Sequence, residues 1–202
     1  RNRSDLFAPE GGHAWQDKLQ LTGFERQARV IAPGDALKVF ELDGARAGIA
    51  VCYDSEFPLP VRAQREAGAR LLLVPSCTDT EAGAPRVRVG CLGRALENRM
   101  LVAQAVTAGE APWSPALDAN TGEAALLAPM DVGLPADGVL AQTRGGEAWA
   151  LVALDAFGLA AAGSAGYGLI KGRAISGDRF VSDPTVSKRL EKELGASIVD
   201  ME

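Results

Sequence analysis

The chain of 202 residues is 47% hydrophobic and carries a formal net charge of −5. Its lysines and arginines are spread along the sequence, which argues against a surface for nucleic acids or anionic membranes. No apolar run approaches the roughly 18 residues of a membrane-spanning helix, and the polar first residues lead into no apolar signal segment. Length and composition therefore favour one globular domain with a substantial core.

The cysteines are three in number, Cys52, Cys77 and Cys91, and they lack the spacing of a metal site. We therefore expect reduced thiols in a cytoplasmic protein, with no metal and no cofactor. The sequence begins without methionine and enters almost at once into a strand-and-turn pattern. From this start we expect that residues precede Arg1 in the natural protein.

Alternation and apolar runs predict a series of short strands separated by two helices in the first half of the chain. The predicted strands are residues 37–42, 45–52, 70–74, 100–107, 124–127, 138–142 and 148–154, with turns at 43–44 and 120–122. The predicted helices are 59–68, 86–99 and 184–194, the last beginning at Asp183-Pro184. The order from 45 to 107 predicts right-handed crossovers and a partly parallel sheet, whereas the later strands favour antiparallel pairing. The glycine-rich residues 163–172 are interpreted as a loop, since no P-loop pattern follows.

Cys52 ends the apolar run that begins at Gly48, and a turn from Asp54 to Pro58 follows it. A side chain at such a strand-to-helix corner lies at the carboxyl edge of the sheet, where ligand crevices of α/β folds open. The amides at the start of the next helix would favour a thiolate and could bind a developing oxyanion. Cys52 is therefore the candidate nucleophile, and Glu56, close behind it, could favour a cationic substrate or simply stabilise the helix start.

A thiol nucleophile needs a proton acceptor and a group that holds negative oxygen. The sole histidine, His13, lies in a glycine-rich turn and is a poor candidate. Lys18 and Glu25 are better ones, because an ammonium beside Cys52 would favour the thiolate and a carboxylate could pair with that lysine or hold a water. Composition alone favours the alternative that both are surface residues.

A third polar group lies in the helix predicted at 86–99, where Arg94 precedes Glu97 and Asn98 by three and four residues. It could be a solvated face, or a buried contact that fixes this helix against the strand bearing the site. Cys91, in the same helix, is expected in the core.

Together these segments resemble the carbon–nitrogen hydrolase (nitrilase) superfamily. The resemblance rests on Lys18 to Glu25, on Cys52-Tyr53-Asp54 and on residues 94–98, in the family's order, and it extends over about residues 5–175. It implies an α/β fold, the α-β-β-α sandwich with mixed sheets, for a domain at residues 1–175, followed by a C-terminal arm at 176–202. It also implies a homodimer or higher homo-oligomer.

In activity, the resemblance implies hydrolysis of a non-peptide C–N bond in a small amide through a thioester at Cys52. Lys18 and the backbone N–H of Tyr53 would hold the oxyanion, and Glu25 would be the further carboxylate near the site. The residues implied to line the pocket are Ser76, Cys77, Thr78, Trp113 and Ser114.

The family's general base is a glutamate tens of residues before the lysine, and that position is not in this sequence. Glu10 lies only eight residues before Lys18, so we do not expect it to be the base. Three alternatives remain: nitrile hydrolysis, acyl transfer at the same site, or a catalytically inactive scaffold with this fold. A flavodoxin-like binding module is disfavoured because no phosphate-binding loop follows the first strand.

Overall fold

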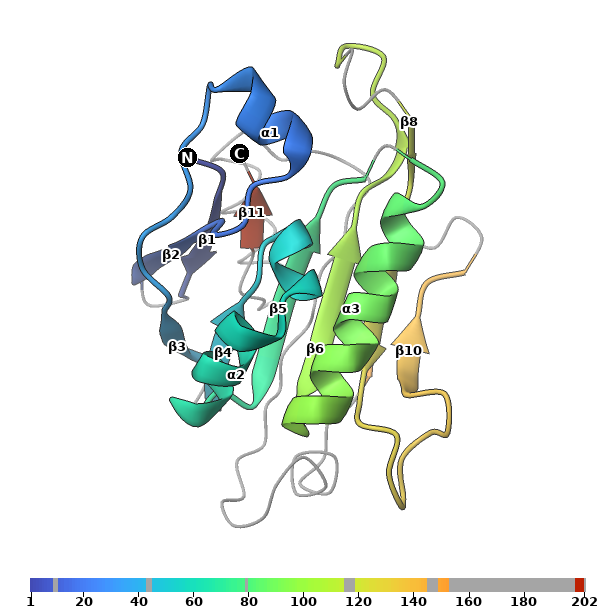
Figure 1. Ribbon diagram of the computed structural model, residues 1–202. Coiled ribbons are helices and arrows are strands. Elements are labelled where there is room, and N and C mark those ends of the chain that lie inside the picture. Colours follow the sequence, from blue (N-terminus) through green and yellow to red (C-terminus); the bar gives the residue numbers. More distant parts are fainter. Residues whose placement is uncertain are drawn as a thin grey trace.

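The computed structural model describes residues 1–8, 11–42, 45–78, 80–114, 119–144 and 149–152, and the backbone of 199–201. Its main feature is a six-stranded mixed sheet in the order β10-β9-β6-β5-β4-β3 (Figure 1). Strands β4, β5 and β6 are parallel to one another, and the outer pairs β3–β4, β6–β9 and β9–β10 are antiparallel. The sheet strands are β3 (Val39–Leu42), β4 (Ala45–Ile49), β5 (Leu71–Ser76), β6 (Leu101–Val106), β9 (Ala124–Leu127) and β10 (Val139–Gln142).

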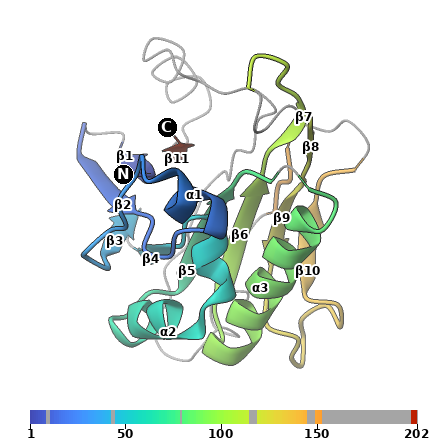
Figure 2. The same ribbon diagram turned by 45° about the horizontal axis from the view of Figure 1, so that its top comes forward.

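Two helices, α2 (Pro58–Glu66) and α3 (Gly83–Asn98), cover one face of this sheet, as Figures 1 and 2 show. Each is the crossover between two neighbouring parallel strands, β4 to β5 and β5 to β6. Successive strand residues point to opposite faces, so Leu72 and Val74 join Val61 of α2 and Val87 of α3 in one core cluster. Leu71, Leu101 and other buried residues form a second cluster.

A smaller sheet is built from β1 (Arg3–Phe7), β2 (His13–Asp17) and β11 (Val199–Met201), in the order β11-β1-β2. Leu6 of β1 packs with Phe40, Ile49 and Val51, so this small sheet is fixed against the β3–β4 edge of the large one. The remaining elements are the short helix α1 (Gly23–Ala28), the 3-10 turn η1 (Cys52–Glu56) and the pair β7 (Ala108–Glu110) and β8 (Ala119–Thr121).

The α/β class and the mixed sheet predicted from the sequence are confirmed, but several local predictions are wrong. The strand before the cysteine ends at Ile49 rather than at Cys52, because the Asp54 carboxylate accepts a hydrogen bond from the Val51 N–H and starts a 3-10 turn. Residues 119–121 form a strand rather than a turn, since they pair with β7. Residues 149–152 carry no strand.

Several predictions fall outside the described residues: the turn at 43–44, Glu10, the glycine-rich residues 163–172, the helix at 184–194 and, apart from the backbone of β11, the arm at 176–202. In the described ranges, none of the helices is both long and apolar enough to cross a bilayer.

Candidate functional site

Cys52 has an uncommon backbone conformation, with φ at 51°. Two other described non-glycine residues have positive φ, Arg29 and Arg99, and both are C-terminal caps of helices, where the left-handed conformation is common. Cys52 instead follows the fully buried Val51 and opens η1. The sharp change of direction lifts the cysteine out of the sheet at its carboxyl edge. Strained backbone of this kind gathers at functional sites. We call Val51 and η1 together the cysteine turn.

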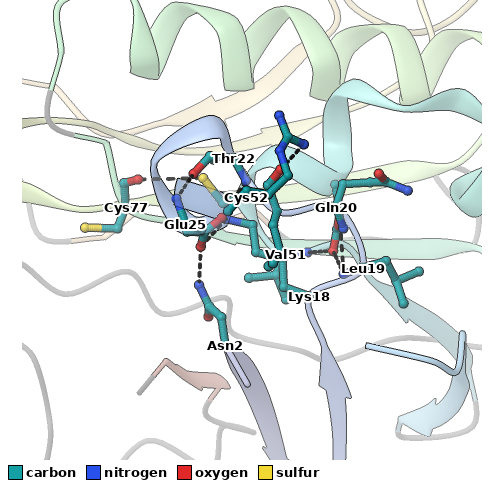
Figure 3. Close-up of polar contacts among 12 residues, drawn as sticks. Asn2, Lys18, Leu19, Gln20, Thr22, Glu25, Val51, Cys52 and Cys77 are labelled. Carbon is teal, nitrogen blue, oxygen red and sulfur yellow. Dashed lines mark hydrogen bonds and ion pairs between the residues drawn. The ribbon is translucent and has the colours of Figure 1, made fainter. Parts of the chain in front are cut away.

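Lys18 and Glu25 form an ion pair beside this turn. The Lys18 Nζ lies 2.8 Å from each carboxylate oxygen of Glu25, and the lysine is only 3% exposed. Glu25 also accepts hydrogen bonds from the Thr22 N–H at 2.6 Å and from the Asn2 side chain at 3.2 Å (Figure 3). Burial alone would raise the pKa of Glu25, but the hydrogen bonds from Lys18 and Thr22 outweigh it, so the pKa lies below its ordinary value.

Helix α1 explains why Glu25 is so well placed. Thr22 caps the helix by accepting from the Glu25 N–H, and the Glu25 carboxylate accepts from the Thr22 N–H in return. The same carboxylate therefore caps the N-terminus of α1 and pairs with a buried ammonium. The Thr-x-x-Glu pattern of a capping box is readable in the sequence, but this helix is not among the predicted ones. We call residues 18–25 the lysine segment.

Asp54 joins the lysine segment to the cysteine turn. Its carboxylate accepts hydrogen bonds from the Leu19 N–H at 3.1 Å, the Gln20 N–H at 2.6 Å and the Val51 N–H at 3.2 Å. Burial raises the pKa of Asp54 above its ordinary value, while these amides and the Lys18 charge act in the opposite direction. The sequence analysis names Asp54 only as part of the turn and the motif after Cys52. Its contacts with Leu19 and Gln20 span 35 and 34 residues, and no local pattern signals them.

Cys52 also approaches the loop that follows β5. Its Sγ lies 3.6 Å from the carbonyl oxygen of Cys77 (Figure 3). The Cys77 thiol contacts Asn120 Oδ1 at 3.5 Å, and Asn120 also accepts from the Thr107 hydroxyl at 2.8 Å. This loop is therefore held by the β7–β8 pair while its backbone touches the candidate nucleophile.

The other residues predicted to line the pocket differ in burial. Ser76 and Thr78 are buried, and within the described part of the chain their hydroxyls have no hydrogen-bond partner. Trp113 and Ser114 lie in the turn after β7, and Trp113 is 71% exposed. The pocket-lining role of these four residues stays a prediction, as does the oxyanion role of the Tyr53 N–H.

Helix α3 is fixed to the cysteine turn from the other side. Arg94, 8% exposed, donates a hydrogen bond to the Ser55 carbonyl at 3.0 Å and forms an ion pair with Glu97 at 2.8 Å. Ser55 in turn donates its hydroxyl proton to the Cys52 carbonyl at 2.8 Å. Of the two interpretations of this helix, the structure therefore supports the buried contact rather than the solvated face.

Other sequence candidates have structural explanations. Glu56 pairs with Arg86 at 2.6 Å, so its charge is already balanced and gives little support to a cationic substrate. His13 is the first residue of β2 rather than part of the predicted glycine-rich turn, and at the surface it pairs with Asp5 and stacks on Phe7. Cys91 is fully buried in the core, as expected. Among the described residues, no three His, Cys, Asp or Glu side chains gather where they could hold a metal ion.

Hydrolases and amidases are among the known proteins similar to this chain. The chain is 33% identical over 143 residues to the probable hydrolase YhcX of Bacillus subtilis, covering 71% of this chain and 28% of that protein. It is also 33% identical over 99 residues to an (R)-stereoselective amidase from Pseudomonas sp., covering 49% of this chain and 35% of that protein. The chain thus spans about a third of the length of these relatives.

Solved structures agree with this likeness. Saccharomyces cerevisiae Nit3, a member of the nitrilase superfamily, shares the fold with a TM-score of 0.60 and 20% identity, covering 72% of this chain and 49% of that one. A mutant of the amidase from Nesterenkonia sp. AN1, in which acrylamide has added to the active-site cysteine, aligns with a TM-score of 0.58 and 29% identity. That alignment covers 70% of this chain and 52% of the amidase. Residues 2–131 match the family model described as carbon-nitrogen hydrolase. The chain therefore belongs to the carbon–nitrogen hydrolase family of the nitrilase superfamily.

Proposed function

We propose that the protein hydrolyses the C–N bond of a small amide, with Cys52 as the nucleophile. One observation carries the proposal: a half-buried cysteine with left-handed backbone lies in a turn that is hydrogen-bonded to the segment of a buried lysine–glutamate pair. A thiol nucleophile with a fixed ammonium nearby to stabilise negative oxygen suits attack on a carbonyl carbon.

In the proposed reaction, the Cys52 thiolate attacks the amide carbon and forms a tetrahedral intermediate. The Lys18 ammonium and the Tyr53 N–H stabilise its negative oxygen. Collapse of the intermediate breaks the C–N bond, and the amine leaves after accepting a proton. Water then attacks the thioester, which releases the carboxylic acid and restores the thiol. The family resemblance assigns the proton transfers to a glutamate that lies outside the matching segments of this sequence.

Glu25 has a supporting role in this proposal. Because both of its oxygens contact the Lys18 Nζ, it holds the ammonium in place. Small amides are favoured as substrates because a variant of the related Nesterenkonia amidase binds butyramide and another carries the acetamide moiety of fluoroacetamide on its active-site cysteine. The buried hydroxyls of Ser76 and Thr78, which flank Cys77, are candidates to bind the amide group.

Three further features belong to the proposal. The cysteines are free in the structure, which supports a reducing compartment such as the cytoplasm. The resemblance to the family supports assembly as a homodimer or a larger homo-oligomer. It also supports a hydrolase domain at residues 1–175 and a separate C-terminal arm at 176–202.

The test is ammonia release from short aliphatic amides by the full-length natural protein, with the matching nitriles and an added hydroxylamine acceptor assayed in parallel. We expect amides to be hydrolysed, and Cys52→Ala to abolish turnover without unfolding the protein. Cys91→Ala, which removes a thiol outside the site, should keep activity. Fluoroacetamide should add its acetamide mass to the peptide that contains Cys52. Ammonia release by folded Cys52→Ala, or a folded wild-type protein inert to amides, would contradict the proposal.

A further inference from the structure

Asp54 has contacts that go beyond those of an ordinary helix cap. One of its oxygens accepts from the Val51 N–H, which caps the 3-10 turn that carries Cys52. The carboxylate also accepts from the N–H groups of Leu19 and Gln20, the two residues that directly follow Lys18. A single side chain thus contacts the main chain on both sides of the gap between the candidate nucleophile and the ammonium.

The other main-chain contacts of Lys18 lead away from Cys52. The Lys18 N–H donates to the Asn2 carbonyl at 2.8 Å, and the Lys18 carbonyl accepts from the Gly34 N–H at 2.7 Å. Both bonds fix the lysine to its own side of the molecule. Between the lysine segment and the cysteine turn, the hydrogen bonds seen in the described part of the chain are those of Asp54.

Water cannot easily replace this carboxylate, because Asp54 is 2% exposed. If the side chain is removed, the amides of Leu19, Gln20 and Val51 lose their acceptor in a buried place, and the two segments must move to satisfy them. Movement of a catalytic group by about 1 Å is enough to cost about 10²-fold in rate. The expected consequence is therefore a displaced ammonium in a folded protein.

We propose that Asp54 is a positioning residue that sets the placement of the Lys18 ammonium relative to the Cys52 thiol. The assignment rests on the proposed amide hydrolysis and deepens it. Asp54 does not touch substrate in this scheme, and it acts through the main chain of its three partners. Its substitution should therefore lower kcat and leave KM little changed.

Two substitutions separate this role from simple structural support. Asp54→Ala removes every acceptor. Asp54→Asn has the same shape and can still accept from Leu19 and Gln20 through Oδ1, but its amide group presents a donor to the Val51 N–H. Asp131→Asn is the matched control, since Asp131 also accepts from a backbone N–H, that of Val132, in a surface turn.

The experiment measures kcat and KM for an amide substrate with the full-length protein, together with thermal melting by circular dichroism. We expect kcat to fall about 10²-fold in Asp54→Ala and about 10-fold in Asp54→Asn, with KM within about threefold of wild type. Asp131→Asn should match wild type. The partial recovery by asparagine is the signature of positioning, because activity lost through unfolding would follow the melting temperature instead.

Other results would overturn the assignment. Folded Asp54→Ala with the wild-type kcat would do so, and so would a loss confined to KM. Should Asp54→Ala fail to fold, Asp54→Asn decides alone, and an unchanged kcat there overturns the proposal. An active wild-type protein with equally active Asp54 variants refutes positioning only, whereas a folded wild-type protein inert to all amides refutes the hydrolase as well.

Discussion

Two cysteines approach Ser55, and the protein gives them opposite surroundings. Cys52 is half-buried in the cysteine turn, and its carbonyl accepts from the Ser55 hydroxyl. Cys91 lies inside α3, is fully buried, and burial raises its pKa to about 12. From this difference we expect the reactivity of each thiol to follow from the backbone that carries it and from its access to solvent. Residue type and closeness to the site do not decide it.

Alkylation is expected to separate the two thiols by the largest margin. With iodoacetamide near neutral pH, Cys52 in the full-length protein should react at least about 100-fold faster than Cys91, which has little thiolate and no exposure. Peptide mass spectrometry of timed samples measures both rates. In guanidinium chloride the rates should converge, which controls for peptide detection. Equal slow labelling of the folded protein would instead favour a catalytically inactive scaffold.

Glu25→Gln tests the Lys18–Glu25 ion pair beside the cysteine turn. We expect the free energy of unfolding to fall by about 2 kcal/mol at pH 7, between the values for exposed and buried pairs, because the Lys18 ammonium loses its charged partner. Urea unfolding followed by circular dichroism measures the change. Glu41→Gln is the matched control, since the Glu41–Arg46 pair lies on the surface.

The stability lost in Glu25→Gln should depend on pH. Folding lowers the pKa of Glu25 below its ordinary 4.5, so the unfolded chain binds the proton more readily. The contribution of the pair is therefore complete above the unfolded pKa and is lost as the pH falls through the folded one. The difference in unfolding free energy between wild type and Glu25→Gln should therefore become smaller as the pH is lowered. A gap that stays constant from pH 7 to pH 3 would mean that the carboxylate charge is unimportant.

Cys91→Ala should have the smallest effect. Removing one buried sulfur atom from the core costs about 1 kcal/mol of unfolding free energy, and amide turnover should be unchanged. Chemical denaturation and the ammonia assay measure the two quantities. Cys91→Ser should be less stable than Cys91→Ala, because it buries a hydroxyl in an apolar cluster. A large loss of activity in folded Cys91→Ala would break the contrast between the two thiols.

The elements that the sequence predicted well are those with a strong repeating pattern. Strands β5 and β6 are largely buried apolar runs, and helices α2 and α3 place residues such as Val61 and Val87 on the face that packs against the sheet, which periodicity reveals. Helix α1 escaped prediction because it buries none of its residues and is only six residues long. Strands β7 and β8 have three residues each, too few for alternation to be visible.

In the candidate site, single residues were easier to predict than their connections. Cys52, Lys18 and Glu25 were chosen for their chemistry, and the structure shows the Lys18–Glu25 pair directly. The bridge through Asp54 could not be predicted, because it depends on how two segments more than thirty residues apart meet in space. The Arg94–Ser55 contact spans 39 residues, so the sequence alone could not decide between a buried contact and a solvated face.

The left-handed conformation of Cys52 costs roughly 1–3 kcal/mol, and neighbouring contacts must supply that free energy. The hydrogen bonds that hold this turn are accepted by the Asp54 carboxylate and donated by Ser55 and Arg94. None of them belongs to the ladder of the large sheet. A local opening can therefore relax the bend at this cysteine while the sheet and its two covering helices remain intact. We therefore expect that the proposed activity is lost at a lower temperature or denaturant concentration than the one that unfolds the large sheet.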